Sequence, residues 1–283
     1  MLDKYLITVK KNGTFFAGYH QSYAQSAEKT YLSEHLRVIR VVSGKGYWKI
    51  ENNIYEVHKG DVLVFNNVTP RQIVEVTSAP LVYELIGFSK DVFSLDTYYI
   101  RLFYTQVPKH PVLSVDIAET KQIHTLFELL KQRFQNNSSG TAVVSCLINA
   151  ICFIINEYFG SKFAEKESTR LPYQTTCEVM EKAIRYIEQH LCELHNVAEI
   201  ADNMHISRGY FHKIFTKYTG YTPKYFINHC RIVRFVSLLT TEDITVLDAA
   251  MKCGFESASG FYKTFYTICG TSPREYLSQH FLK

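Results

Sequence analysis

Two patterns of hydrophobic residues divide the chain. Between about residues 19 and 88, short alternating or β-branched runs are separated by turn-forming glycine, asparagine and aspartate. Short strands at this spacing are typical of a small antiparallel barrel or sandwich. The expected strands are residues 36–42, 47–50, 54–57, 62–65 and 72–76, and the expected turns include residues 43–46, 51–53, 59–61 and 66–67.

Helical periodicity replaces this pattern after residue 111. Hydrophobic residues between 123 and 134 recur at i, i+3, i+4, i+7 and i+11, which is one face of a helix. Residues 142–159 are apolar and long enough to cross a membrane. However, Ser145, Asn149 and Asn156 share one stripe of that helix, which favours packing in a protein core or a dimer interface instead.

A polar segment containing Pro172 follows and reads as a linker, and the rest of the chain is expected to be helical. The last third carries a repeat: residues 215–226 and 265–276 both read Phe-x4-Gly-x-(Ser/Thr)-Pro-x-x-aromatic. The glycine suits the left-handed end of a helix, and the Ser/Thr-Pro pair suits the cap and first position of the next helix. Each copy therefore predicts the junction of two helices.

Upstream of each copy lies an alanine followed four residues later by a turn residue. Ala201 precedes His205, and Ala250 precedes Gly254. A small residue and a tight turn suit two closely crossing helices, as in a helix-turn-helix, whose second helix enters the DNA major groove. Histidine tolerates the left-handed conformation better than most residues do. The alternative is a purely structural helical repeat.

Charge placement favours the DNA-binding interpretation. The whole chain has a net charge of only +4, but residues 176–203 carry −4 and residues 235–283 carry −1. Residues 205–234 contain six basic residues and no acidic one. Six uncompensated cations would give strongly salt-sensitive binding to phosphates. They are Arg208, Lys213, Lys217, Lys224, Arg231 and Arg234.

The C-terminal third resembles the AraC/XylS family of transcription regulators over about residues 178–278. Residues 197–215 are similar to the first helix-turn-helix of that family, and residues 249–265 with 270–276 are similar to its second, signature motif. The resemblance implies two such units, joined by a long helix at about residues 222–239. Their recognition helices would enter successive major grooves, about 34 Å apart.

The resemblance also implies which residues meet DNA. In the first recognition helix, Lys213 is expected to donate to guanine, and Thr216 and Lys217 to clamp phosphates. The second recognition helix has Ala258 and Gly260 where bulkier polar residues are often found, and it is expected to discriminate less between bases. Tyr210, Phe211, Ile214 and Phe215 are expected to be core. The expected DNA-binding residues are Arg208, Gly209, His212, Lys213, Thr216, Lys217, Ser257, Ala258, Tyr262 and Lys263.

The N-terminal part resembles the cupin-like sensor barrel of the same family, through residues 44–46 and 60–65 before Pro70. His20, His35 and His58 are scattered, so neither a metal nor another cofactor is expected, and no catalytic residue is assigned. The competing interpretations are a cupin-type metal-dependent enzyme fused to a helical domain, and a structural or interaction module.

A barrel without metal can bind an organic ligand among aromatic residues. The expected lining residues are Tyr19, His20, Arg37 and Tyr83, and an inward Arg37 would suit a hydroxyl-rich or carboxylated ligand. The expected effector is a small molecule such as a sugar or related metabolite.

The expected fold class is α+β, with a cupin-like antiparallel barrel at residues 1–110, a helical dimerisation segment at 111–160, a linker at 161–176 and an all-α DNA-binding domain at 177–283. Expected partners are double-stranded DNA, the effector, a second copy of the chain and RNA polymerase, but no membrane. Seven cysteines without a Cys-x-x-Cys pair argue against a disulfide framework. With no signal peptide pattern at the start, a cytoplasmic location is expected.

Overall fold

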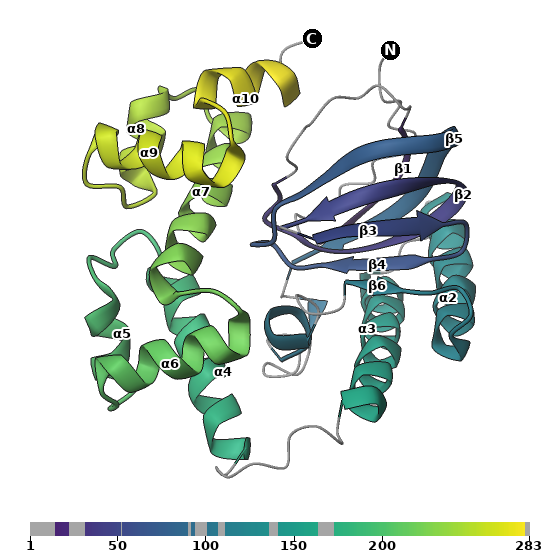
Figure 1. Cartoon of the computed structure of the whole chain (residues 1–283), viewed down its shortest axis with the longest axis horizontal. Coiled ribbons are helices and arrows are strands. Elements are labelled where there is room, and N and C mark those ends of the chain that lie inside the picture. Colours follow the sequence, from purple (N-terminus) through teal and green to yellow (C-terminus); the bar gives the residue numbers. More distant parts are fainter. Residues whose placement is uncertain are drawn as a thin grey trace. The chain divides into compact units, whose positions relative to one another are not determined.

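The computed structural model describes residues 15–22, 32–51, 53–89, 92–93, 101–106, 111–135, 141–163 and 173–280 (Figure 1). These residues fall into two compact units. The first contains a sheet and two long helices, and the second contains residues 173–280 together with 32–34 and 67–72.

The sheet of the first unit has six strands in the order β1-β5-β2-β4-β6, with β3 paired to β2. The pairs β1–β5, β2–β3, β2–β4 and β4–β6 are antiparallel. The sheet curls into a half-barrel (Figure 1), so the expected antiparallel sheet is confirmed, while its likeness to a cupin barrel stays a prediction. The strands are Phe15–Ser22 (β1), Leu36–Ile50 (β2), Asn53–His58 (β3), Val62–Phe65 (β4), Arg71–Phe88 (β5) and Val112–Leu113 (β6).

The two glycines at 44 and 46 lie inside strand β2, so the expected turn at residues 43–46 is wrong. Gly44 has a φ of +86°, and a Cβ there would lie 2.7 Å from the carbonyl oxygen of Pro80. A Cβ at Gly46 would lie 2.8 Å from the carbonyl oxygen of Glu75. The glycines therefore allow the backbone of β5 to approach β2, which a sequence pattern cannot distinguish from a turn.

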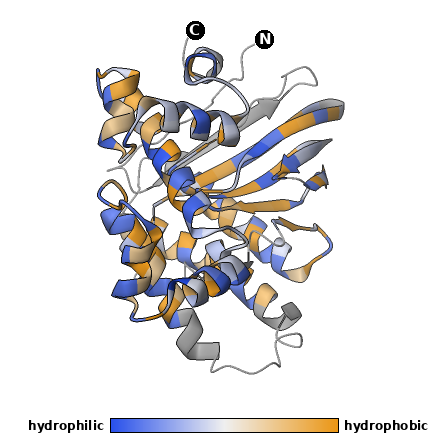
Figure 2. Cartoon of the chain, turned by 60° about the vertical axis from the view of Figure 1, so that its left-hand side comes forward, coloured by the Kyte–Doolittle hydropathy of each residue, from blue (hydrophilic) through white to orange (hydrophobic). Residues whose placement is uncertain are grey.

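One face of the sheet forms a hydrophobic core. The ring of Trp48 stacks on Phe65 with centroids 5.6 Å apart and meets Tyr83 edge-on at 5.5 Å. Figure 2 shows hydrophobic and hydrophilic residues alternating along the strands, as expected for a sheet whose two faces differ. The cluster consists of Ile39, Val41, Trp48, Ile50, Val57, Leu63, Phe65, Ile73, Val76, Leu81, Tyr83 and Leu85.

An ion cluster ties the sheet to helix α2 (Ala118–Gln135). Arg40 of β2 is 6% exposed, and its Nε donates to Oε2 of Glu84 on β5 at 2.6 Å. Lys131 of α2 donates to the other oxygen of Glu84 at 2.7 Å, and Arg40 also contacts Glu128 of α2. The expected helix at residues 123–134 is confirmed as α2.

The second apolar segment forms helix α3 (Thr141–Phe163), preceded in the chain by α2 and a short π-helix, η2 (Arg101–Gln106). The Asn149 amide donates to the carbonyl oxygens of Val92 and Ser145, both at 2.8 Å. Among the described helices, Ala142–Phe159 is the one stretch with the length and composition to span a membrane, and a third of that window (33%) is buried.

The second unit is all helical. Its elements are α4 (Tyr173–His190), α5 (Val197–Asn203), α6 (Arg208–Thr219), α7 (Pro223–Thr241), α8 (Val246–Lys252), α9 (Ala258–Cys269) and α10 (Pro273–His280). Helices α5 and α6 form one pair of consecutive helices and α8 and α9 another, with one pair at each end of α7 (Figure 1).

The turns of this unit have the conformations that the repeat predicts. Gly220 and Gly270 end α6 and α9 with φ of +79° and +74°. The Thr222 hydroxyl accepts from the Tyr225 amide and caps α7, which starts at Pro223. His205 has a φ of +55°, so the expected left-handed histidine is confirmed.

Candidate nucleic-acid interface

Helix α6 has one buried and one exposed face. Its first turn is capped by Ser207, whose hydroxyl accepts from the Tyr210 amide at 3.3 Å. Phe211 and Phe215 are fully buried, and Ile214 is 5% exposed. The opposite face carries exposed residues expected to meet DNA: Arg208, Gly209, His212, Lys213 and Lys217. Because the apolar residues anchor the helix, these side chains project from a rigid support.

Two of the six expected cations are not free. Arg231 is 9% exposed, and its guanidinium donates to main-chain carbonyl oxygens within the unit. Arg234 is half exposed and lies 3.5 Å from a carboxylate oxygen of Glu34. The expectation of six uncompensated cations is therefore wrong, because spacing along a helix does not tell which side chains turn inward.

The remaining four basic side chains are exposed: Arg208, Lys213, Lys217 and Lys224. Within the part of the chain that the structure describes, none of them forms an ion pair or a side-chain hydrogen bond. They are thus available to phosphates or base edges.

Two further residues of α6 differ from expectation. Tyr210 is 38% exposed, so its assignment to the core is wrong. The Thr216 hydroxyl oxygen is buried and has no hydrogen-bond partner among the described residues, so it does not face solvent as a phosphate clamp would. Lys217, the other residue expected to clamp a phosphate, is exposed.

Helix α9 presents a more aromatic face. Ser257 is its N-cap, and the hydroxyl accepts from the Gly260 amide at 3.2 Å, so this expected DNA residue also holds the first turn. Ala258 is half-buried. Tyr262 is 48% exposed, and Lys263 is exposed at the position equivalent to Lys213.

Tyr266 is a candidate DNA contact that sequence reasoning missed. It is 64% exposed, the highest value among the exposed large hydrophobic residues of the described chain. The fifty-residue repeat places it opposite Thr216, so the alignment of the two copies contained the signal. An exposed tyrosine can donate its hydroxyl to a phosphate or contact a thymine methyl with its ring.

The expected ligand-lining residues are only partly brought together. Tyr83 is 5% exposed and belongs to the core cluster around Trp48. Arg37 is half-buried on β2, opposite Phe65 of β4. The register of β1 places His20 opposite Tyr83 and Tyr19 opposite Glu84. The side chains of Tyr19 and His20 lie outside the described ones.

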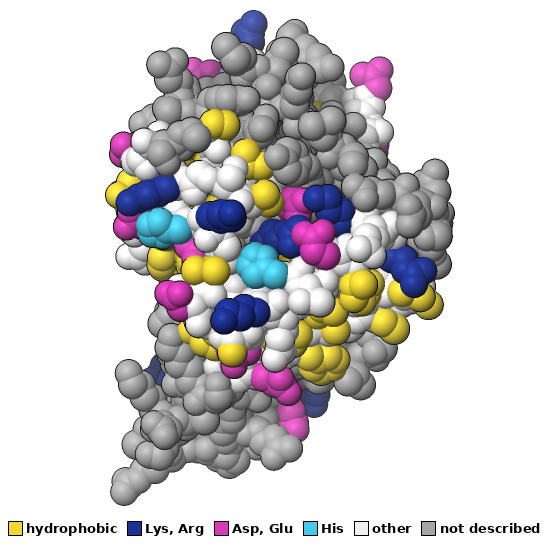
Figure 3. Space-filling view, turned by 90° about the vertical axis from the view of Figure 1, so that its right-hand side faces the viewer, with side chains coloured by type: hydrophobic (Ala, Val, Ile, Leu, Met, Phe, Trp, Pro, Cys, Tyr) yellow, Lys and Arg dark blue, Asp and Glu magenta, His cyan; other side chains and the backbone are white. Residues whose placement is uncertain are grey.

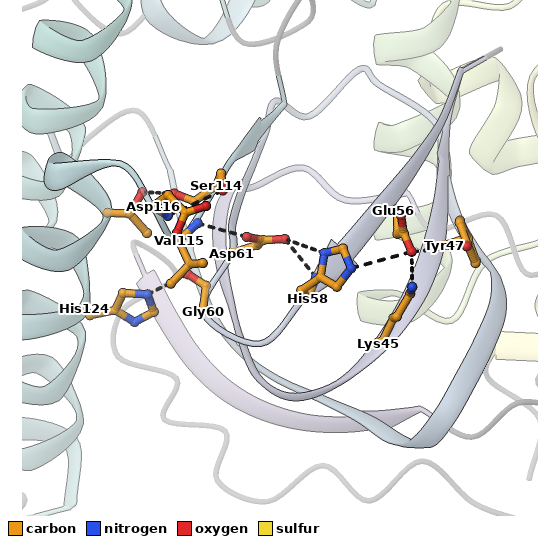
Figure 4. A network of polar contacts seen from close by, with 11 residues as sticks. Lys45, Tyr47, Glu56, His58, Gly60, Asp61, Ser114, Val115, Asp116 and His124 are labelled. Carbon is orange, nitrogen blue, oxygen red and sulfur yellow. Dashed lines mark hydrogen bonds and ion pairs between the residues drawn. The ribbon is translucent and has the colours of Figure 1, made fainter.

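The Gly60-Asp61 pair is part of a polar network that joins a turn of the sheet to helix α2 (Figure 4). The Asp61 carboxylate accepts from the amides of His58 at 2.8 Å and Val115 at 3.0 Å. The Gly60 carbonyl oxygen lies 2.7 Å from Nε2 of His124 on α2. Gly60 has a φ of +94°, and a Cβ there would collide with Val115. The motif thus has a structural role in the described residues.

One face of the molecule carries side chains of several chemical kinds. Figure 3 shows histidine, basic and acidic side chains lying together next to hydrophobic ones. The imidazole of His58 lies 3.5 Å from Glu56 and 3.7 Å from Asp61. Among the residues that the structure describes, no group of three or more His, Cys, Asp and Glu side chains is placed to hold a metal ion.

Comparison with known proteins points to gene regulation. Residues 200–279 match the family model described as a helix-turn-helix domain. The regulatory protein PocR of Salmonella typhimurium is 29% identical over 48% of this chain and 45% of its own length, so that match spans less than half of PocR. The lactose operon transcription activator of Staphylococcus xylosus is 22% identical over 83% of this chain and 81% of its own.

A solved structure extends the likeness to the whole fold. ToxT of Vibrio cholerae superposes with a TM-score of 0.64 and 18% identity, covering 94% of this chain and 99% of ToxT. At that identity the likeness concerns the fold alone.

Proposed function

Because the helix-turn-helix domain of this chain belongs to the AraC/XylS family of transcription regulators, we propose that the protein binds a two-part DNA site through α6 and α9 together. The two recognition helices would lie in successive major grooves on one side of the duplex, about one helical turn apart. A small-molecule effector bound by the N-terminal unit would change how tightly that site is held.

The exposed faces of the two recognition helices carry this proposal. Lys213 and Lys263 are both exposed at equivalent positions of the repeat, while the phenylalanines that follow them, Phe215 and Phe265, are fully buried. The same division of faces in both copies leaves cationic and hydrogen-bonding side chains outward on each helix. Groove binding gives that arrangement a use that a purely structural repeat would not need.

A footprint tests the two-part site. DNA fragments selected by the full chain from a random pool would be footprinted with the wild type and with the variant Tyr262→Ala/Lys263→Ala. We expect two protected segments about ten base pairs apart, with the second segment lost in the variant. A single protected segment, unchanged in the variant, would contradict the use of α9.

The effector is best matched by an apolar molecule with one carboxylate. The core cluster around Trp48 is built from apolar and aromatic residues, which offer few partners for the many hydroxyls of a sugar. Arg37 lies two residues before the buried Ile39 on β2, so the two share one face of the strand, and Arg37 supplies one cation near that cluster. ToxT structures contain an unsaturated fatty acid or a naphthalenyl butenoic acid. The sugar expected from the sequence is the competing class.

Thermal unfolding separates the two classes. A ligand that binds the folded chain raises its melting temperature by mass action. We expect a shift with medium-chain or long-chain carboxylic acids, a smaller shift in Arg37→Met, and none with a panel of neutral sugars. A shift with a sugar alone would restore the original expectation.

We also propose that α3 forms the dimer interface. Val143 and Phe153 are 42% and 43% exposed on α3, and Leu147 and Ile154 are half-buried beside them. Apolar side chains on one helix face suit a symmetric interface with a second copy. Ile151, on the same helix, is 1% exposed and faces the interior of its own unit.

Sedimentation checks this interface. Phe153→Glu is expected to convert a dimer into a monomer, because a charge would be buried in the apolar contact. The control is Val74→Glu, a change of the same kind at a 45% exposed position of β5. A Phe153→Glu chain that sediments as the wild type does would rule out α3 as the contact.

A further inference from the structure

A buried cation lies at the middle of α7, between the two helix-turn-helix units. Arg231 is 9% exposed, yet its hydrogen bonds run to main-chain oxygens and not to a carboxylate. Its Nε donates to the carbonyl of Leu191 at 3.1 Å, and its Nη2 donates to the carbonyl of Leu194. Both carbonyls belong to the loop that joins α4 to α5, which is the first helix of the α5–α6 pair.

The same guanidinium also contacts the second helix pair, α8 and α9. Its central carbon lies 5.9 Å from the ring centroid of Phe255, in the turn between α8 and α9. A Cβ at the neighbouring Gly254 would lie 3.0 Å from Nη2 of Arg231 and 2.5 Å from the carbonyl oxygen of Cys192. The turn of the second unit therefore packs backbone-to-backbone against the loop that leads into the first.

The equivalent turn between α5 and α6 lacks this constraint. His205, which corresponds to Gly254, also has a positive φ, but its side chain is exposed. A left-handed turn alone thus accepts histidine, and the close approach to Cys192 accounts for the glycine at 254. A further contact crosses the same boundary: the His195 imidazole lies 3.5 Å from the Glu256 carboxylate, and both side chains are exposed.

These contacts join three parts of the domain at one place, which we name the interunit joint: residues 191–195, Arg231 and residues 254–256. Without it, the two units would be held together chiefly by the single helix α7. Burying a guanidinium is costly unless its hydrogen bonds are satisfied, and removing it leaves the carbonyl oxygens of Leu191 and Leu194 without their donor.

We propose that Arg231 is a positioning residue that fixes the orientation of α9 relative to α6, so that both helices can occupy their grooves at once. This inference rests on the proposed two-part DNA site. When two binding modules are held at the right geometry, the second binds as an intramolecular event, and the gain is lost when the geometry no longer fits. Arg231 would thus contribute to DNA affinity without touching DNA.

The test compares two-part and one-part DNA. The probe is a duplex selected from a random pool by the wild-type chain, and its two protected segments are called boxes, the second being the one assigned to α9. It is used in three forms: intact, with the second box scrambled, and with one base pair inserted between the two boxes. Affinities are measured by fluorescence anisotropy for the wild type, Arg231→Met and Arg234→Met. Arg234 is the matched control, an arginine one helical turn further along α7 with a half-exposed side chain.

We expect Arg231→Met to bind the intact duplex about tenfold more weakly and the scrambled duplex with wild-type affinity. The inserted base pair should weaken the wild type and Arg234→Met strongly, but Arg231→Met much less, because its second unit is no longer held at one angle. Arg231→Lys, which retains the charge but not the two-nitrogen geometry, should show affinities and a spacing dependence between those of the wild type and Arg231→Met. A purely structural role would not alter the dependence on box spacing.

Equal losses on intact and scrambled duplexes, or unchanged spacing dependence in Arg231→Met, would overturn the proposal. If Arg231→Met does not fold, the same measurements on Arg231→Lys decide between these outcomes. A wild-type chain whose affinity is the same for intact and scrambled duplexes would instead contradict the two-part site, and this is seen before any variant is compared.

Discussion

The ring of Phe215 meets the ring of Phe226 edge-on, with centroids 5.3 Å apart and 80° between the planes. Fifty residues later, Phe265 meets Tyr276 at 5.7 Å and 82°. In each copy of the repeat this pair fastens α6 or α9 to the helix that follows it, so the sequence repeat is also a repeat of packing geometry. Helices α6 and α9 are therefore held by the same kind of contact.

This contact predicts a large loss of stability on truncation. Phe226 is 1% exposed, so Phe226→Ala should lower the free energy of unfolding by about 3–5 kcal/mol, through lost burial and the cavity left behind. Phe226→Leu keeps most of the volume and should cost clearly less. Urea unfolding followed by circular dichroism measures both. Equal losses in the two variants would mean that the aromatic ring contact, and not the buried volume, supplies the stability.

Two glycines, one inside α6 and one at its C-terminal end, are expected to respond in opposite ways to substitution by alanine. At Gly209, inside α6, no atom lies within 4 Å of an added Cβ, so Gly209→Ala should stabilise the chain by about 0.5–1 kcal/mol. Gly220 also has open space but a φ of +79°, so Gly220→Ala should destabilise it by about 1 kcal/mol. Melting temperatures that move in the same direction would refute this assignment. A loss of DNA affinity in Gly209→Ala would place the duplex against this position.

The buried His229 of α7 predicts a loss of stability in mild acid. Burial lowers the pKa of its imidazole from 6.5 to about 3, so the folded chain keeps it neutral. Below pH 6.5 the unfolded chain binds a proton that the folded chain does not. The free energy of unfolding should thus fall by about 2 kcal/mol between pH 7 and pH 5, and continue to fall toward pH 3.

Urea unfolding at several pH values measures this dependence. His229→Phe, which cannot bind the proton, should show a flatter profile over the same range. A variant profile parallel to that of the wild type would assign the acid sensitivity to other groups.

The exposed lysines predict separable effects on DNA binding. Lys217→Ala should weaken binding to all sequences and reduce the slope of log affinity against log salt by about 0.9. Lys213→Ala should instead narrow the difference between the preferred site and a mismatched one, by about 1–3 kcal/mol. Lys263→Ala should weaken binding across all sequences.

Lys252 provides a control for these measurements. It is exposed on α8 but donates to Glu242 at 3.0 Å, so Lys252→Ala should leave both the salt slope and the sequence preference unchanged. Equal, sequence-specific losses at Lys213 and Lys263 would contradict the expected asymmetry between the two helices.

The sequence determined the local features of this protein. Hydrophobic spacing located α2, and the Gly-x-(Ser/Thr)-Pro repeat located the left-handed glycines and the capped starts of α7 and α10. These features depend on residues close together in the chain, such as Thr222 and Tyr225. For the same reason the repeat could locate the two helix pairs α5–α6 and α8–α9.

Tertiary structure decided what each such residue does. Gly44 and Gly46 serve the close approach of β5 and not a turn, because the atoms that exclude a Cβ lie some thirty residues away. Arg231 and Lys217 are both basic residues of the acid-free stretch 205–234, yet Arg231 is buried because carbonyls of residues 191 and 194 lie within its reach. Contacts between distant residues leave no periodic pattern, so only the packed molecule distinguishes a cation that holds the domain together from one that is free to meet DNA.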